Sequence, residues 1–211
     1  MRTLVFLLLA ATPVYAQDTG PISVIERAEI PVARGVDAPP HGASVTFAYL
    51  ENTGWGPEQI LPAVAQLAKI LEQCGVALTS AELVRIAAPA RFRDFVTPTS
   101  RQLAQALQLA KPTVYFVAGT RQRPAFDAEA IGRGNSRTRP ELADTVWITR
   151  GTRDLGIALA HELVHVLMDS GEHSDAPGNL MREETAREHT RLTDAQCTRI
   201  RITGLANGLV R

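Results

Sequence analysis

Two histidines stand four residues apart in the stretch His161-Glu162-Leu163-Val164-His165, and this spacing suits metal binding. On a helix, residues i and i+4 share one face with Cβ atoms about 5–6 Å apart, so both imidazoles can reach one ion. Neutral imidazole nitrogen is a zinc ligand, and the glutamate of an H-E-x-x-H helix serves as general base. The stretch therefore predicts a zinc site at His161 and His165, with Glu162 as the catalytic base.

The same spacing also arises by chance on ordinary amphipathic helices, so the flanking sequence has to be weighed. Residues 154–168 carry apolar side chains at helical periodicity. These are Leu155, Ala158, Leu159, Leu163, Val166 and Leu167. We therefore expect one continuous helix that presents both histidines on the same face.

A third histidine follows this helix. Gly171 suits the left-handed conformation that reverses a chain at a helix end, and His173 can then fold back toward the first two histidines. Asn179-Leu180-Met181 comes next, after a Ser-Asp-Ala-Pro-Gly stretch. Together with the H-E-x-x-H helix, these residues resemble the zinc motif and Met-turn of matrixin-type metzincin peptidases. The resemblance implies His173 as third zinc ligand and Met181 as a soft floor beneath the histidines.

The chain departs from the metzincin pattern in the spacing of its third histidine. The usual motif has its glycine three residues after the second histidine and its third histidine six after, whereas Gly171 and His173 come six and eight residues after His165. We expect the two extra residues to lengthen the last helical turn. Oxygen ligands remain alternatives to His173, namely Asp169, Asp175, Glu183, Glu184 and Glu188.

The resemblance implies a reaction. Three histidines leave one position open on a tetrahedral zinc ion, where a bound water has a pKa near 7. Glu162 would take a proton from this water as it attacks a carbonyl, then pass the proton to the leaving nitrogen. We expect a zinc-dependent endopeptidase that acts on peptide or protein substrates. The alternative is a secreted zinc-binding module of the same fold without turnover, which a closed four-ligand site would favour.

The N-terminus predicts export. Residues 1–16 combine Arg2, an apolar run over residues 4–11 and a small residue, Ala16, before the expected cleavage point. This is the pattern of a secretory signal peptide, and the apolar run is too short to span a bilayer. We expect a secreted or periplasmic protein without stable membrane insertion after cleavage.

The chain has two cysteines, Cys74 and Cys197. An even cysteine count in an exported protein predicts a disulfide between them, and two buried free thiols are the alternative.

Composition indicates one globular domain and excludes some partners. The chain has 211 residues, of which 45% are hydrophobic, and 22 basic residues balance 22 acidic ones. A chain of this balance lacks the overall positive field that attracts nucleic acid. We expect no nucleic-acid partner and a monomer.

The order of elements fits the same family over nearly the whole mature chain. Residues 17–42 form an N-terminal extension with a short strand at 22–30, either a tail packed on the domain or a pro-segment, and residues 43–211 the catalytic domain. The resemblance implies an α+β, metzincin-like zincin domain with a twisted mixed sheet of four to five strands, an active-site helix, a Met-turn and a C-terminal helix. Strands are expected at 43–50, 76–88, 113–118, 128–133 and 145–149, and helices at 57–73, 101–109, 154–168 and from a Thr193 cap to about 205. The strand near residues 128–135 would be the antiparallel edge that lines the cleft.

Overall fold

The computed structural model describes residues 20–32 and 39–211, so the predicted signal peptide at residues 1–16 lies outside the described residues. Its main feature is a six-stranded mixed sheet of order β1-β3-β2-β5-β8-β7. The four central strands are parallel to one another, and an antiparallel strand closes each edge. The strands are β1 (Ser23–Glu29), β2 (His41–Leu50), β3 (Val76–Ala87), β5 (Thr113–Phe116), β7 (Ala128–Ile131) and β8 (Thr145–Ile148). A separate short pair consists of β4 (Asp94–Phe95) and β6 (Gly119–Thr120).

The α+β class and the mixed sheet are as predicted, with one strand more than the four to five expected. The additional strand is β1, which the sequence assigns to the N-terminal extension. It pairs antiparallel with β3 along its whole length, with Ser23 opposite Ala87 and Glu29 opposite Glu82. Most of β1 is exposed, so the strand is held chiefly by its backbone hydrogen bonds and not by burial. The strand lies where the sequence predicts a short strand, at residues 22–30, and only its pairing with the main sheet was not expected.

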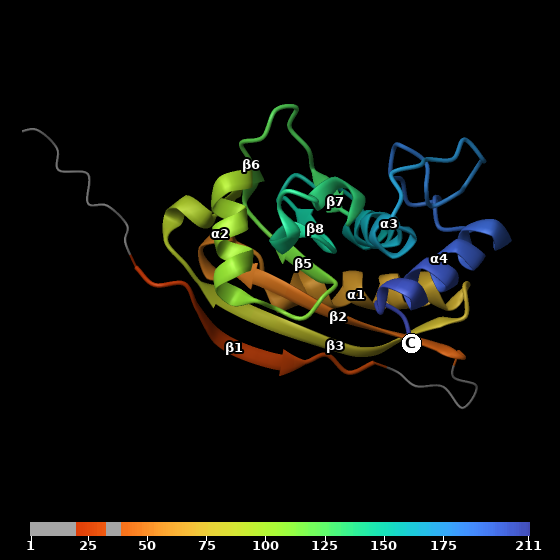
Figure 1. Ribbon diagram of the computed structural model, residues 1–211, viewed down its shortest axis with the longest axis horizontal. Helices are drawn as coiled ribbons and strands as arrows, with labels where there is room; N and C mark the ends of the chain where they lie inside the picture. The colour runs from red at the N-terminus through yellow and green to blue at the C-terminus, as the bar shows by residue number, and fades with distance from the viewer. Residues whose placement is uncertain (1–19, 33–38) are drawn as a thin grey trace, which may run out of the picture.

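Four helices cover the sheet: α1 (Pro57–Glu72), α2 (Thr97–Leu107), α3 (Leu155–Met168) and α4 (Asp194–Asn207). Helices α1 and α3 pack together against one face, and α2 contributes to a second core on the other face (Figure 1). Short 3-10 turns connect these elements at Glu51–Thr53, Ala90–Phe92, Gly134–Ser136 and Pro140–Leu142. Among the described residues, no helix is long and apolar enough to span a bilayer.

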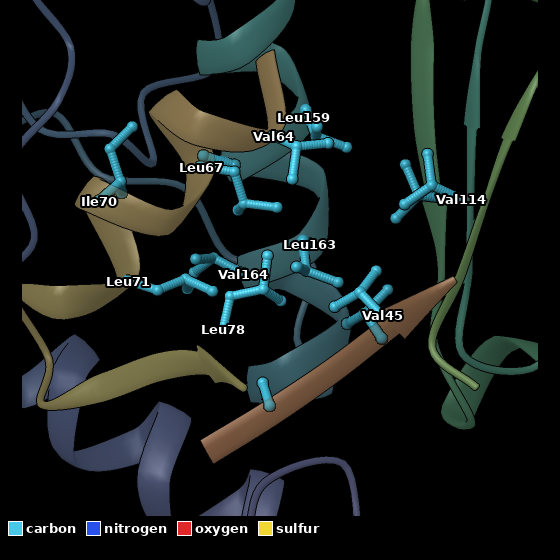
Figure 2. Close-up of a cluster of buried hydrophobic side chains, with 14 of the residues drawn as sticks. Val45, Val64, Leu67, Ile70, Leu71, Leu78, Val114, Leu159, Leu163 and Val164 are labelled. Carbon is cyan, nitrogen blue, oxygen red and sulfur yellow. The ribbon is translucent and has the colours of Figure 1, made fainter. Parts of the chain in front are cut away.

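The larger core lies between α1, α3 and the sheet. Figure 2 shows Val64 of α1 and Leu159 of α3 among the apolar side chains that meet Val45 and Val114 of the sheet. Each of these four residues is at most 3% exposed. Burying a side chain of this size stabilises the fold by about 1.5–3 kcal/mol. The core therefore fixes α3, the helix of the predicted zinc motif, against the centre of the sheet.

Two helix starts differ in how well the sequence predicted them. Helix α4 begins at the predicted capping box, in which the Gln196 amide N–H donates to Thr193 Oγ1 and the Thr193 amide N–H to Gln196 Oε1. Helix α2 begins at Thr97 instead of Arg101. Pro98 lies in its first turn, where a missing N–H leaves no helical hydrogen bond unmade, so this proline starts the helix.

The predicted disulfide is present between Cys74, just after α1, and Cys197 of α4. Their Cα atoms are 4.6 Å apart, and 123 positions separate them in the sequence. Closing a loop of this length stabilises the folded state by about 5 kcal/mol in the chain-entropy model. The bridge ties the C-terminal helix to the end of the first helix.

Candidate metal centre

Helix α3 carries the H-E-x-x-H motif and is almost entirely buried. Of its 14 residues, only Leu155 and Glu162 are not classed as buried. A helix that is apolar on all sides packs in a protein interior, where its side chains have fixed positions. His161 and His165 are 3% and 8% exposed, respectively, so both imidazoles are held in place by the core.

The Nε2 atoms of the two helical histidines face each other. Their Nε2 atoms are 3.0 Å apart. The Nδ1 atom of His161 lies 2.8 Å from the Leu180 carbonyl oxygen, and that of His165 lies 2.6 Å from the Ser170 carbonyl oxygen. A carbonyl oxygen can only accept, so each Nδ1 carries the proton and each Nε2 has a free lone pair. Such outer partners fix the tautomer and the ring orientation of metal-binding histidines.

The third histidine completes a cluster of three. The ring centroid of His173 is 5.3 Å from that of His161 and 5.0 Å from that of His165. The candidate ligand atoms of the three residues all lie within 4.8 Å of one another. His173 is exposed, in contrast to the other two, because it comes from the loop after α3.

The turn into this loop differs from the expected one. The left-handed residue is Asp169, with φ 46°, and not Gly171. Aspartate tolerates this conformation better than most residues, and here it ends the helix directly after Met168. The two extra residues of the motif consequently lie in the loop and do not lengthen the helix. The loop is long enough for His173 to return to the other two histidines.

The predicted Met-turn is a tightly bonded, buried segment. Met181 and Leu180 are both fully buried. The Met181 amide donates to Asn179 Oδ1 at 2.9 Å, and its carbonyl oxygen accepts from the Ser174 amide at 2.7 Å. The Asn179 side chain in turn exchanges two hydrogen bonds with Gln196 of α4. This network holds the Leu180 carbonyl that orients His161.

Burial keeps the two helical imidazoles neutral. It lowers the pKa of His161, and together with the neighbouring His161 it lowers the pKa of His165 to about 4. Neutral imidazole is the form that binds a metal ion. Both rings are therefore ready to bind a cation at neutral pH.

Glu162 lies beside the histidines and contacts the edge strand. The Ala130 backbone of β7 lies next to its carboxylate. Burial, followed by the nearby charge of Glu129, raises the pKa of Glu162 to about 8, and the Ala130 backbone lowers this pKa by less. A carboxyl group with a pKa near the operating pH can both accept and return a proton. A cation at the histidines would favour its ionised form.

A cleft of about 400 Å³ runs past the three histidines and Glu162. One wall is β7, the last strand of the sheet, and no strand of the described residues pairs with its outer edge. The predicted antiparallel edge beside the cleft is therefore present. The lining contains the carboxylates of Glu129, Glu162, Asp169 and Glu183 and no lysine or arginine.

Most alternative ligands lie away from the histidine cluster. Among the described residues, only His161, His165 and His173 form a group of potential ligands close enough to share one ion. Asp169 and Glu183 line the same cleft but are not part of this group, while Asp175, Glu184 and Glu188 do not line it.

The geometry of the cluster fits a zinc ion. Ligand nitrogens at about 2.0–2.1 Å from a tetrahedral zinc lie roughly 3.3 Å from each other, which is close to the observed 3.0 Å between the two Nε2 atoms. Two lone pairs that face each other at this distance repel, and a cation between them removes the repulsion. His161, His165 and His173 would hold the ion.

Comparison with known proteins supports the same class of fold. No protein-family model and no curated protein matches the sequence. Among solved structures, metalloproteinase-II from Bacteroides fragilis matches with a TM-score of 0.51 and 16% sequence identity, over 83% of this chain and 57% of that one. The chain shares its fold with that protein. It spans little more than half the length of the matched protein.

Some residues of the site were not predicted from the sequence. Glu129 lines the cleft although its strand was expected only to offer a backbone edge. The carbonyl groups of Ser170 and Leu180 orient the histidines, and no sequence pattern identifies a backbone acceptor. Asp169 was considered as an oxygen ligand, whereas it forms the helix-ending turn. Its position directly after the last apolar residue of α3 was the available sign.

Proposed function

We propose that the chain is an exported zinc-dependent endopeptidase that hydrolyses peptide bonds. The observation that carries the proposal is the convergence of three histidines beside Glu162, with two of their Nδ1 atoms already bound to backbone carbonyls. His161, His165 and His173 act as the zinc ligands, and Met181 packs as part of the core that supports them. The signal-like sequence of residues 1–16 and the disulfide support export.

The outer edge of β7 supports a peptide as the substrate. An extended peptide binds an unpaired strand edge through main-chain hydrogen bonds, with its side chains directed alternately to either side. On this edge, the Ala130 backbone also lies next to the Glu162 carboxylate. A peptide added to β7 would therefore place a backbone carbonyl next to the histidine cluster and the base.

The residues of the chain divide the reaction between them. When bound, zinc supplies Lewis acidity that lowers the pKa of a water molecule and polarises the scissile carbonyl. Glu162 removes one proton from the attacking water, whose oxygen bonds to the carbonyl carbon. Glu162 then transfers that proton to the leaving nitrogen as the C–N bond breaks. A residue that performs both transfers contributes about 10²–10⁴-fold to the rate.

The test is peptide hydrolysis by the zinc-loaded wild type and a Glu162→Gln variant, assayed on a library of internally quenched peptides. We expect the wild type to cleave and the variant to lose about 1000-fold or more in kcat, with its zinc content unchanged. Glu184→Gln is the matched control because it removes a carboxylate outside the cleft lining.

Equal turnover by wild type and Glu162→Gln would contradict the proposed role of this base. Zinc binding without cleavage of any peptide would support the alternative, a zinc-binding module of the same fold. The same loaded protein thus distinguishes the two functions.

A further inference from the structure

Asp169 contacts the segment that follows the edge strand β7. Its Oδ1 atom accepts hydrogen bonds from the backbone amides of Arg133, at 3.0 Å, and Gly134, at 3.4 Å. These residues come just after Ile131, the last residue of β7. The residue that ends the metal-binding helix therefore also bonds the end of the strand that forms the other wall of the cleft.

Gly132 leaves room for this contact. A Cβ atom built on Gly132 would lie 2.7 Å from Asp169 Oδ1, which is closer than side chains pack. At Gly134 a Cβ atom would meet nothing within 4 Å. Of these two neighbouring glycines, only Gly132 is required by the position of the Asp169 carboxylate.

The side chain of Arg133 anchors the same segment to the rest of the fold. Its Nε atom lies 2.9 and 3.1 Å from the two carboxylate oxygens of Asp144, which directly precedes β8. Its guanidinium also donates to the side chain and the backbone carbonyl of Asn207 at the end of α4. The Asp144 side chain is only 7% exposed, whereas that of Arg133 is 41% exposed, so the carboxylate side of this ion pair is shielded from water. The segment that Asp169 bonds is therefore also held by the contacts of Arg133 with Asp144 and Asn207.

On its other side, Asp169 is linked to the metal centre. The next residue, Ser170, provides the carbonyl oxygen that accepts from His165 Nδ1. A shift of the turn at Asp169 would move both this acceptor and the contact with Arg133. One residue therefore couples the orientation of a metal ligand to the position of the peptide-binding edge.

We propose that Asp169 is a positioning residue. Its hydrogen bonds to the Arg133 and Gly134 amides, which we call the Asp169 lock, hold the end of β7 against the end of α3 and thereby set the geometry of the cleft. The proposal rests on the proposed peptidase function for its catalytic consequence. Its structural part, the lock itself, is tested without turnover.

Two substitutions of Asp169 distinguish the role of its side-chain hydrogen bonds from the role of its left-handed backbone conformation. Asp169→Gly keeps the left-handed conformation without strain but removes the acceptor, whereas Asp169→Asn keeps a side-chain oxygen and also tolerates this conformation. In Asp169→Gly we expect amide hydrogen exchange over residues 128–134 to accelerate about tenfold or more, because hydrogen bonds to a charged acceptor contribute at least this factor. Because its amide oxygen is an uncharged acceptor, Asp169→Asn should accelerate exchange less than Asp169→Gly, and β8 should exchange equally in all three proteins.

A second pair of variants approaches the lock from the opposite side. Gly132→Ala should accelerate exchange over the same segment, because its new methyl group displaces the Asp169 carboxylate. Gly134→Ala is the matched control and should not. Unchanged exchange in both Asp169→Gly and Gly132→Ala, or equal acceleration by Asp169→Asn and Asp169→Gly, would overturn the proposal.

Metal and substrate measurements test the coupling. Asp169→Gly should bind zinc about tenfold more weakly in a chelator competition, as expected when the partner of a ligand is loosened. It should also raise KM more than it lowers kcat, and Asp169→Asn should change both less than Asp169→Gly. If the wild type cleaves no peptide, the proposed function fails, while exchange and zinc affinity still decide whether the lock exists. Zinc affinity equal to wild type in Asp169→Gly would overturn the coupling.

Discussion

Helix α3 and the loop that follows it contribute to the candidate metal centre in different ways. The helix presents His161 and His165 from a buried position, and each ring is oriented by a backbone carbonyl. The loop presents His173 in an exposed position, and no hydrogen bond to its ring occurs among the described residues. The helix therefore holds a pair of oriented histidines, and under the proposed function the loop would add the third ligand.

This difference predicts unequal contributions to metal affinity. A ligand already fixed in its bound orientation loses little conformational freedom when the ion binds, whereas an exposed side chain must be ordered at that moment. We expect the affinity to depend mainly on the helical pair. The loop histidine should tune the affinity and close the coordination sphere.

The largest expected effect comes from removing one helical histidine. His161→Ala or His165→Ala should weaken zinc binding by about 1000-fold, since structural zinc sites derive about 10–16 kcal/mol from a few ligands. Competition with a chromogenic chelator measures the affinity. A loss no greater than that of His173→Ala would remove the distinction between helix and loop.

A second effect is acid sensitivity of the zinc-free protein. The pKa of His165 is lowered from 6.5 to about 4, chiefly by burial, so the folded state binds fewer protons than the unfolded state between these values. The free energy of unfolding should therefore fall as the pH decreases from 6.5 to 4, by about 3 kcal/mol from this residue. Urea titrations of wild type and His165→Gln should show a shallower pH dependence in the variant. Equal slopes would mean that the buried imidazole does not resist protonation.

The loop histidine should have a smaller effect on affinity. His173→Ala should weaken zinc binding by about tenfold or somewhat more, because the helical pair remains intact. The same chelator competition measures it. Wild-type affinity in this variant would show that His173 is not a ligand.

The smallest effect concerns the carboxylates after the Met-turn. Glu183→Gln and Glu184→Gln should each change zinc affinity by less than about twofold, since exposed charges interact weakly in water. Glu183 lines the cleft and Glu184 does not, so the pair also controls for a contribution of the cleft wall. A loss in Glu183→Gln larger than in His173→Ala would replace the third histidine by a carboxylate.

The sequence predicted the elements that rest on periodic burial and missed those that rest on local backbone chemistry. The bounds of α3 were predicted to within one residue, because its apolar positions repeat and its core contacts enforce them. The turn at Asp169 was expected at Gly171, because glycine is the usual left-handed residue and the stabilising bonds of Asp169 come from residues 35 and 36 positions earlier. Strand β1 was predicted as a short strand at residues 22–30, but its place at the edge of the main sheet was not, because it is held by backbone pairing and not by a buried face.

The most direct test of the candidate metal centre is the zinc content of the mature protein, measured by elemental analysis on protein never exposed to a chelator. We expect about one zinc per chain in the wild type and in Glu162→Gln, and a loss of tightly bound zinc in a His161→Ala/His165→Ala double variant. Wild-type protein without tightly bound metal, or a double variant that keeps its zinc, would contradict the assignment of this cluster as the metal centre.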